Sequence, residues 1–172
     1  KMQIATGIDA LQIFDSHGGH LESSEFQEGS GRWMKEIVAR LGAPASGPAR
    51  SSGSAQHAGS ETGAPPVIVF SLGTHGNWPE LITSGANVLG IDWQTDLAAA
   101  RKIIPSHIGM QGNLSPTLIV EGTPEIVASE TTKVLETMRG RPGHIFNLGH
   151  GLTPGAKLEN IQALVDTVKA FK

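Results

Sequence analysis

One short stretch near the end of the sequence sets a histidine between two glycines, directly after an apolar run. The stretch is HIFNLGHGL, residues 144 to 152, and the histidine is His150. Gly149 and Gly151 have no Cβ atoms to hold a ligand away from the backbone. We therefore interpret His150 as a functional residue that is presented to a ligand where a strand ends.

Other polar and aromatic residues also follow apolar runs. They are Phe14, Asp15 and Ser16; His75 and Asn77; Asp92 and Trp93; Gln111 and Asn113; and Asn147. This hydrogen-bonding, weakly charged set suits a polar small molecule better than a phosphorylated one, and no glycine-rich nucleotide motif occurs. For Asp92, Asn113 and Asn147 we favour a structural role, because such side chains often cap helices or bind turn amides.

The length, net charge and amino-acid composition of the sequence exclude several classes of function. The chain has 172 residues, a net charge of −3 and no cysteine. Without a dense Lys/Arg run, binding to nucleic acid or anionic lipid is not expected. The absence of cysteine removes disulfides, thiolate nucleophiles and thiolate zinc sites. His17 and His20 are not part of an H-E-x-x-H pattern, so we expect no metal site.

Five apolar runs predict the strands that position these residues. The runs lie at 10–19, 67–77, 88–96, 107–116 and 144–152, and most are continuous rather than alternating. Continuous runs indicate strands covered on both faces, as in parallel sheets. Helices are predicted between and after them at 23–41, 79–84, 95–103, 123–140 and 157–171. The alternation predicts an α/β fold, either a doubly wound sheet or a (β/α) barrel.

The helix at 123–140 is predicted to begin with Thr123 as its N-cap and Pro124 at its first position. This helix and the one at 157–171, whose apolar face includes Leu158, are predicted to lie against the sheet through one apolar face each. In the first helical segment, 23–41, Phe26, Met34, Ile37, Val38 and Leu41 should face inward, and Gly29 and Gly31 weaken its first half. A segment at about 42–66 is nearly all Gly, Ala, Pro and Ser. It is predicted to be a disordered insertion within one domain, residues 1–172, rather than a linker.

Four motifs in order resemble the uroporphyrinogen decarboxylase family. They are LQIFDSHGGHL (11–21), VLGIDW (88–93), MQGNLSP (110–116) and GHIFNLGHGL (143–152). The resemblance implies a distorted (β/α)8 TIM-type barrel, of which this chain would hold only the C-terminal strands and helices. A complete barrel typically needs about 250 residues, and the chain reaches a strand within ten residues of Lys1. We therefore expect it to begin within a larger barrel.

The resemblance also implies an activity and a set of site residues. The family removes the four acetate carboxyl groups of uroporphyrinogen III, giving coproporphyrinogen III in haem and chlorophyll biosynthesis, with no metal or organic cofactor. Ser16 should hydrogen-bond a substrate carboxylate, Phe14 should form part of the cleft wall, and His150 should contact another acidic side chain of the tetrapyrrole. No catalytic residue is assigned to this chain, because the family's catalytic aspartate, arginine-rich loop and cleft tyrosine belong to its N-terminal part. Turnover by this chain alone is not expected.

Two alternatives remain open at this point. The chain could be a truncated barrel fragment that acts as a binding or assembly module, since an open barrel leaves strand edges unpaired. A methyl-transferring relative that binds zinc through cysteine is disfavoured by the absence of cysteine. The resemblance further implies a homodimer as the full protein. With no membrane span or signal peptide in the sequence, we expect a cytoplasmic protein, or a plastid one in a photosynthetic eukaryote.

Overall fold

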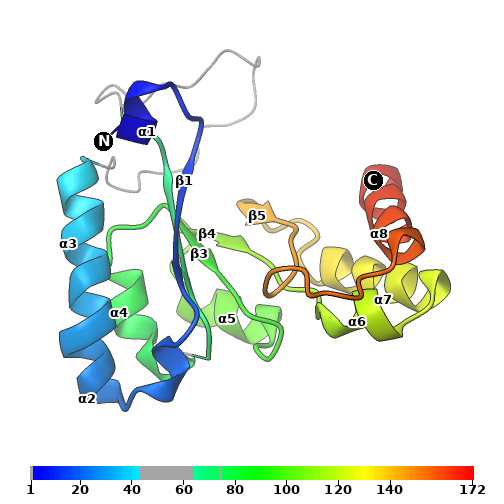
Figure 1. Ribbon diagram of the computed structural model, residues 1–172, viewed down its shortest axis with the longest axis horizontal. Helices are drawn as coiled ribbons and strands as arrows, with labels where there is room; N and C mark the ends of the chain where they lie inside the picture. The colour runs from blue at the N-terminus through cyan, green and yellow to red at the C-terminus, as the bar shows by residue number, and fades with distance from the viewer. Residues whose placement is uncertain (1, 43–63, 74) are drawn as a thin grey trace. The chain divides into compact units, whose positions relative to one another are not determined.

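The computed structural model describes residues 2–42, 64–73 and 75–172, in which helices alternate with strands (Figure 1). The strands are β1 (Leu11–Asp15), β2 (Val67–Ser71), β3 (Val88–Gly90), β4 (Gly109–Gln111) and β5 (His144–Ile145). The α-helices are α1 (Met2–Ala5), α2 (Ser23–Phe26), α3 (Arg32–Leu41), α4 (Trp78–Ile82), α5 (Leu97–Ile103), α6 (Thr117–Glu121), α7 (Pro124–Thr137) and α8 (Leu158–Ala170). Shorter turns are the 3-10 turns η1 (Gly18–His20) and η3 (His75–Asn77) and the π-helical turn η2 (Gln27–Gly31).

The strands form one five-stranded sheet in the order β1-β2-β3-β4-β5, which is also their order in the sequence. β1 pairs with β2, and β4 with β5, in parallel. A doubly wound sheet reverses its strand order at a switch point, whereas consecutive strands of a (β/α)8 barrel are neighbours. The predicted α/β class is thus confirmed, and the strand order favours the barrel over the doubly wound sheet.

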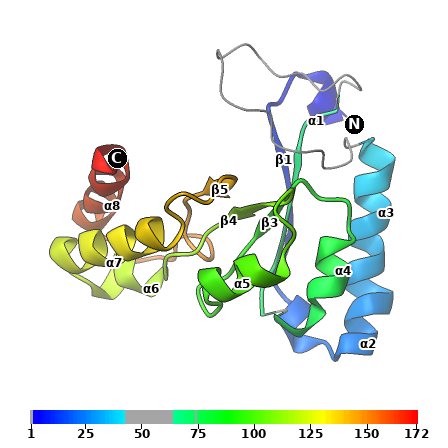
Figure 2. The same cartoon turned by 180° about the vertical axis from the view of Figure 1, so that it is seen from behind.

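The chain forms two compact units. The first comprises residues 1–89 and 104–109, and the second comprises residues 90–103 and 110–172. In the first unit, β1 and β2 pair from Leu11 and Val67 to Asp15 and Ser71, and every residue of β2 is buried. Both views place α3 and α4 on the same side of β1 and β2 (Figures 1 and 2). The buried apolar side chains on these helices are Met34 and Val38 of α3 and Leu81 of α4.

The predicted helix at 23–41 is interrupted in its first half. A π-helical turn, η2, replaces the regular helix between α2 and α3 and contains Gly29 and Gly31. A Cβ on Gly31 would lie 3.3 Å from the Phe26 carbonyl oxygen, so the turn packs closely on the preceding residues. Phe26, Met34 and Val38 are buried as predicted, but the inward placement of Ile37 was wrong, because this side chain is 43% exposed. Ile37 instead lines an open cavity beside β1.

The predicted disordered insertion lies for the most part outside the described residues, at 43–63. The residues at its two ends are part of the described structure. Gly42 ends α3 in the left-handed conformation, with φ of 71°, which glycine adopts without strain. At the other edge the Pro66 carbonyl oxygen accepts a 3.0 Å hydrogen bond from the Leu11 amide.

The second unit has its own apolar core. Leu114, Ile119 and Val127 are buried, and the partly buried residues packed against them are Leu118, Val134, Phe146, Leu148, Ala156, Ile161 and Leu164. α8 packs mainly on α7, so the prediction that α8 lies against the sheet was wrong. Leu158, which the predicted apolar face of α8 includes, is 80% exposed. Helix-on-helix contact buries a narrower stripe than helix-on-sheet contact would.

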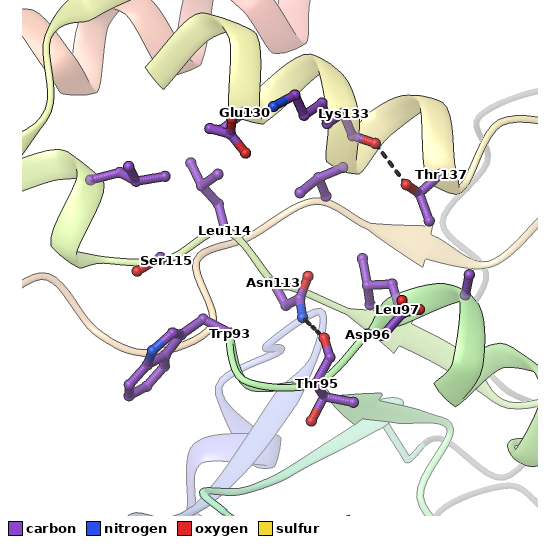
Figure 3. A pocket seen from close by; sticks show the side chains of 13 residues that line it. Trp93, Thr95, Asp96, Leu97, Asn113, Leu114, Ser115, Glu130, Lys133 and Thr137 are labelled. Carbon is purple, nitrogen blue, oxygen red and sulfur yellow. Dashed lines mark hydrogen bonds and ion pairs between the residues drawn. The ribbon is translucent and has the colours of Figure 1, made fainter. Parts of the chain in front are cut away.

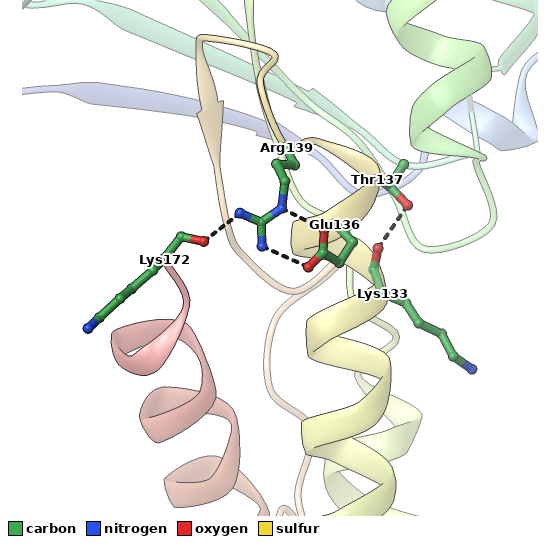
Figure 4. A network of polar contacts seen from close by, with 5 residues as sticks. All are labelled: Lys133, Glu136, Thr137, Arg139 and Lys172. Carbon is green, nitrogen blue, oxygen red and sulfur yellow. Dashed lines mark hydrogen bonds and ion pairs between the residues drawn. The ribbon is translucent and has the colours of Figure 1, made fainter.

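The ends of α7 and α8 are joined by a polar contact (Figure 4). Arg139 donates from Nε and Nη2 to the Glu136 carboxylate, at 2.6 and 2.7 Å, and from Nη1 to the Lys172 carbonyl oxygen. Its guanidinium carbon also lies 4.3 Å from the centre of the Phe171 ring. One arginine thus binds the C-terminal turn of α7 and stacks on the residue that follows α8.

A short helix that the sequence pattern did not indicate, α6, is attached to α8 by a buried amide. Asn160 is fully buried, and its Nδ2 donates to the carbonyl oxygens of Ile119 at 3.1 Å and Gly122 at 3.0 Å. These carbonyls belong to the end of α6, where helical partners are lacking. Among the described residues, no helix has both the length and the apolar character needed to cross a membrane.

Candidate functional site

Ser16 lies on the turn that follows β1, and the carboxylate of the preceding residue holds this turn in place. Asp15 accepts hydrogen bonds from the His17 amide at 3.0 Å, from the Ser71 hydroxyl at 3.0 Å and from the Ser30 hydroxyl. Burial raises the pKa of Asp15, but the hydrogen bonds from Ser30, His17 and Ser71 outweigh it and hold the pKa below the usual aspartate value. Asp15 is therefore a charged anchor of the turn, and Ser16 beside it is exposed.

Phe14 and Ser16 lie together on the wall of one open cavity in the first unit. The cavity has a volume of about 470 Å³, and Trp33 and Ile37 of α3 also line it. Phe14 is 67% exposed and makes an edge-to-face contact with Phe70, with ring centres 6.1 Å apart. An exposed aromatic ring next to an exposed hydroxyl can offer a flat apolar surface and a hydrogen bond to the same ligand.

The glycines after Ser16 bring this turn against the end of β2. A Cβ on Gly19 would lie 2.7 Å from the Gly73 Cα and from the Leu72 carbonyl oxygen. The Gly19 amide in turn donates to the Leu72 carbonyl oxygen at 2.8 Å. Backbone therefore packs on backbone at the carboxyl ends of β1 and β2, which fixes the place from which Ser16 is presented.

His150 lies in the second unit, next to Trp93. The two rings are nearly perpendicular, at 82°, with centres 6.0 Å apart. The interpretation that both flanking glycines admit a ligand was wrong for Gly149, which is buried and whose Cβ would lie 2.8 Å from the Trp93 Cα. Gly149 is needed for packing against Trp93. Gly151 is exposed with open space around it and fits the original interpretation.

Two of the three strand-end residues for which a structural role was favoured hold the loop after β3. The Asp92 carboxylate accepts from the Gln94 amide at 2.9 Å and from the Thr95 hydroxyl at 3.1 Å. The Asn113 Nδ2 donates to the carbonyl oxygens of Asp92 and Thr95, at 2.7 and 2.6 Å. The structural interpretation of Asp92 and Asn113 is thereby confirmed.

Asn147 differs from these two because its residue is exposed. Its Oδ1 accepts a 2.9 Å hydrogen bond from the amide of the next residue, Leu148. This is a local turn contact, as the structural interpretation predicted.

A second cavity, of about 370 Å³, lies wholly within the second unit (Figure 3). Figure 3 shows Trp93 and Thr95 across from Glu130, Lys133 and Thr137 of α7. The Lys133 Nζ donates to the Glu130 carboxylate at 2.6 Å. The sequence did not predict that Glu130, Lys133 and Thr137 of α7 line a cavity. Helical periodicity gives no signal for them, because they occupy the polar face of the helix, which usually contacts solvent.

The histidines do not assemble into a metal site in the part of the chain that the structure describes. No group of three or more His, Asp or Glu side chains there could hold a metal ion. The His17 and His20 rings make an edge-to-face contact, with an angle of 67° between their planes and centres 5.6 Å apart. His144 has a structural contact, since its Nε2 lies 2.7 Å from the Gly112 carbonyl oxygen, and burial lowers its pKa despite this hydrogen bond.

Comparison with known proteins identifies relatives over nearly the whole chain. The uroporphyrinogen decarboxylase (URO-D) family model matches residues 1–171. The chain is 35% identical over 170 residues to uroporphyrinogen decarboxylase from Methylococcus capsulatus, covering 98% of this chain and 43% of that protein. It is 39% identical over 167 residues to the enzyme of the same name from Pseudomonas fluorescens, covering 96% of this chain and 42% of that protein. The chain thus spans less than half the length of these relatives.

A solved structure supports the fold alone. A methyltransferase from Methanosarcina mazei matches with a TM-score of 0.73 and 15% identity, covering 96% of this chain and 43% of its own. The likeness agrees with the α/β architecture, while the match of the family model decides the family. The chain belongs to the uroporphyrinogen decarboxylase family.

Proposed function

We propose that the protein to which this chain belongs is an enzyme, a carboxy-lyase that converts uroporphyrinogen III to coproporphyrinogen III. The observation that carries the proposal is the family match over residues 1–171, with two relatives named uroporphyrinogen decarboxylase at 35% and 39% identity. Because the match extends over both units, it favours a part of this enzyme over a separate binding or assembly module. The chain would supply the C-terminal part of a single (β/α)8 barrel domain.

In the proposed reaction, each acetate side chain loses its carboxyl group as CO₂ and gains a proton, so that it becomes a methyl group. Protonation of a pyrrole carbon creates a cation that accepts the electron pair of the breaking carbon–carbon bond. A carboxylate placed near this cation would stabilise it. We assign that carboxylate to the N-terminal part of the enzyme, because Asp15 is engaged by Ser30, Ser71 and the turn amides, and Asp92 by Gln94 and Thr95.

The roles that we assign to this chain concern substrate binding. Ser16 would donate a hydrogen bond to a carboxylate of the tetrapyrrole, and Phe14 would contact a face of the macrocycle. Their shared cavity and their exposure support this assignment. His150 would donate to another acidic side chain, since an imidazole N–H is a hydrogen-bond donor. The open space at the exposed Gly151, the next residue, supports such a contact.

The remaining features of the proposal concern the whole protein. We propose that it works without a metal or organic cofactor, acts in tetrapyrrole biosynthesis leading to haem, and forms a homodimer. The substrate is its only proposed ligand, and neither nucleic acid nor membrane is a proposed partner. As the matched relatives cited above are bacterial proteins, we place the reaction in the cytoplasm.

The experiment that tests the proposal is anaerobic conversion of uroporphyrinogen III, with products separated by porphyrin chromatography. The chain is assayed alone and after mixing with the N-terminal half of a related decarboxylase. We expect coproporphyrinogen only from the mixture. Conversion by the chain alone would contradict the assignment of the cation-stabilising carboxylate to the N-terminal part. No conversion by the mixture, with both pieces folded and associated, would contradict the proposed activity.

A further inference from the structure

The loop that carries His150 is held in place by backbone contacts within the second unit. Leu114 and Leu148 form an isolated parallel bridge. The Leu114 amide donates to the Asn147 carbonyl oxygen at 3.1 Å, and the Gly149 amide donates to the Leu114 carbonyl oxygen at 2.8 Å. These contacts fix the backbone as far as the residue directly before His150.

Gly149 then brings His150 against Trp93. The position of a Cβ on Gly149 is occupied by Trp93, whose Cα and Cβ would both lie 2.8 Å from it. Trp93 is itself fixed on both sides, because the Asn113 amide binds the carbonyl oxygens of Asp92 and Thr95. Two immobilised loops therefore set the separation of the Trp93 and His150 rings, rather than side-chain rotation alone.

We propose that Trp93 is a positioning residue for His150, which orients the imidazole for its hydrogen bond to a substrate carboxylate. The perpendicular ring arrangement is one that aromatic pairs favour, and it restricts rotation of the imidazole. An imidazole already held in its binding orientation loses less conformational entropy when the ligand arrives. The choice of a carboxylate as the ligand rests on the proposed function, whereas the ring contact is independent of it.

The ring contact is tested by tryptophan fluorescence in the 172-residue chain. Because the imidazole lies against the indole, with ring centres 6.0 Å apart, replacing His150 should change the emission of Trp93. Trp33→Phe with Trp78→Phe leaves Trp93 as the single tryptophan of the three in the chain. We expect His150→Gln to shift the emission of this single-tryptophan chain, and His107→Gln, at an exposed position, to leave it unchanged. Equal emission from the chain with and without His150→Gln would overturn the contact.

The functional part is tested with the same mixture that assays the proposed activity. Trp93→Leu should lower kcat/KM by about tenfold through KM, and the loss should vanish in a His150→Gln background, as coupled residues require. Trp93→Phe keeps an aromatic ring and should retain most of the activity. Equal losses for Trp93→Leu with and without His150 would overturn the positioning role. If the unmodified mixture is inactive, the proposed function fails, while the fluorescence comparison still decides the ring contact.

Discussion

The side-chain amide of Asn113 donates a 2.7 Å hydrogen bond to the carbonyl oxygen of Asp92. This bond joins the loops that follow β3 and β4, and a second one to the Thr95 carbonyl oxygen, at 2.6 Å, strengthens the join. Asn113 is buried, with 8% exposure, so water cannot readily replace the amide. The loop that presents Trp93 therefore depends on a residue of the loop after the next strand.

Asn113→Ala should lower the free energy of unfolding by about 1–3 kcal/mol, because one buried and one partly buried carbonyl oxygen each lose a hydrogen bond. Urea denaturation followed by circular dichroism measures the change. Asn147→Ala is the matched control, since that side chain is exposed and binds only the neighbouring Leu148 amide. Equal effects of the two substitutions would contradict the role given to Asn113.

Gly149→Ala and Gly151→Ala form a second matched pair in the loop of His150. Alanine at 149 would overlap the Trp93 backbone and should cost about 1–3 kcal/mol of stability, the usual range for overpacking. Alanine at 151 meets nothing within 4 Å and should leave the midpoint of denaturation unchanged. A destabilised Gly151→Ala beside an unaffected Gly149→Ala would show that the packing of this loop has been assigned to the wrong glycine.

Asp15 should make stability depend on pH in the acidic range. Its folded pKa lies below the usual value of 3.8, so the carboxylate stabilises the fold above that pH, and this contribution disappears as the pH falls through the folded pKa. Asp15→Asn should therefore be less stable than the unmodified chain at pH 7, and the difference should be smaller at a pH well below 3.8. Denaturation at both pH values, with the exposed Asp9→Asn as control, measures the difference. A constant difference between the two pH values would contradict the account of Asp15.

His144 should add a dependence on pH nearer neutrality. Burial lowers its folded pKa below the usual 6.5, so the folded state favours the neutral ring. Its contribution to stability is therefore complete above pH 6.5 and declines as the pH falls below that value. His144→Gln should flatten the fall in stability between about pH 7.5 and 5, whereas the exposed His107→Gln should not. Denaturation midpoints across this range provide the measurement, and an unchanged slope in His144→Gln would be contrary to expectation.

The contact between the ends of α7 and α8 makes Arg139 a further test. Arg139→Ala removes the bonds to Glu136 and Lys172 and the stacking on Phe171, and should lower the melting temperature. Arg139→Lys keeps the charge but not the forked geometry of the guanidinium. Its melting temperature should lie between those of the unmodified chain and Arg139→Ala. Arg40→Ala breaks only an exposed pair with Glu36 on α3 and should have little effect. Equal melting temperatures for Arg139→Ala and Arg40→Ala would contradict the role of Arg139 in joining the ends of α7 and α8.

Local signals in the sequence predicted many elements well. α7 begins at Pro124 with Thr123 as its N-cap, whose hydroxyl accepts from the Ile126 amide, and this is the start that Thr123 and Pro124 predicted. The parallel sheet also followed from the continuous apolar runs. The short helix α6, by contrast, has only five residues, and so short a segment carries too few turns for helical periodicity to show.

Contacts between distant residues were harder to predict. The interior placement of Ile37 and Leu158 failed because an apolar stripe does not reveal how wide a face its neighbour will cover. The structural purpose of Gly149 depends on Trp93, which is far away in the sequence, and single-sequence patterns contain no information about such a pair. Ser16, Phe14 and His150 were selected from family motifs, and their roles in binding remain predictions.

The central claim is that this chain supplies substrate-binding residues to a uroporphyrinogen decarboxylase, and one comparison tests it most directly. Anaerobic conversion of uroporphyrinogen III is measured for the chain mixed with the N-terminal half of a related decarboxylase, using the unmodified chain, Ser16→Ala, His150→Gln and Arg40→Ala. The account predicts conversion with the unmodified chain and with Arg40→Ala, and a loss of about tenfold or more in kcat/KM for Ser16→Ala and His150→Gln. Full activity in both Ser16→Ala and His150→Gln would contradict it.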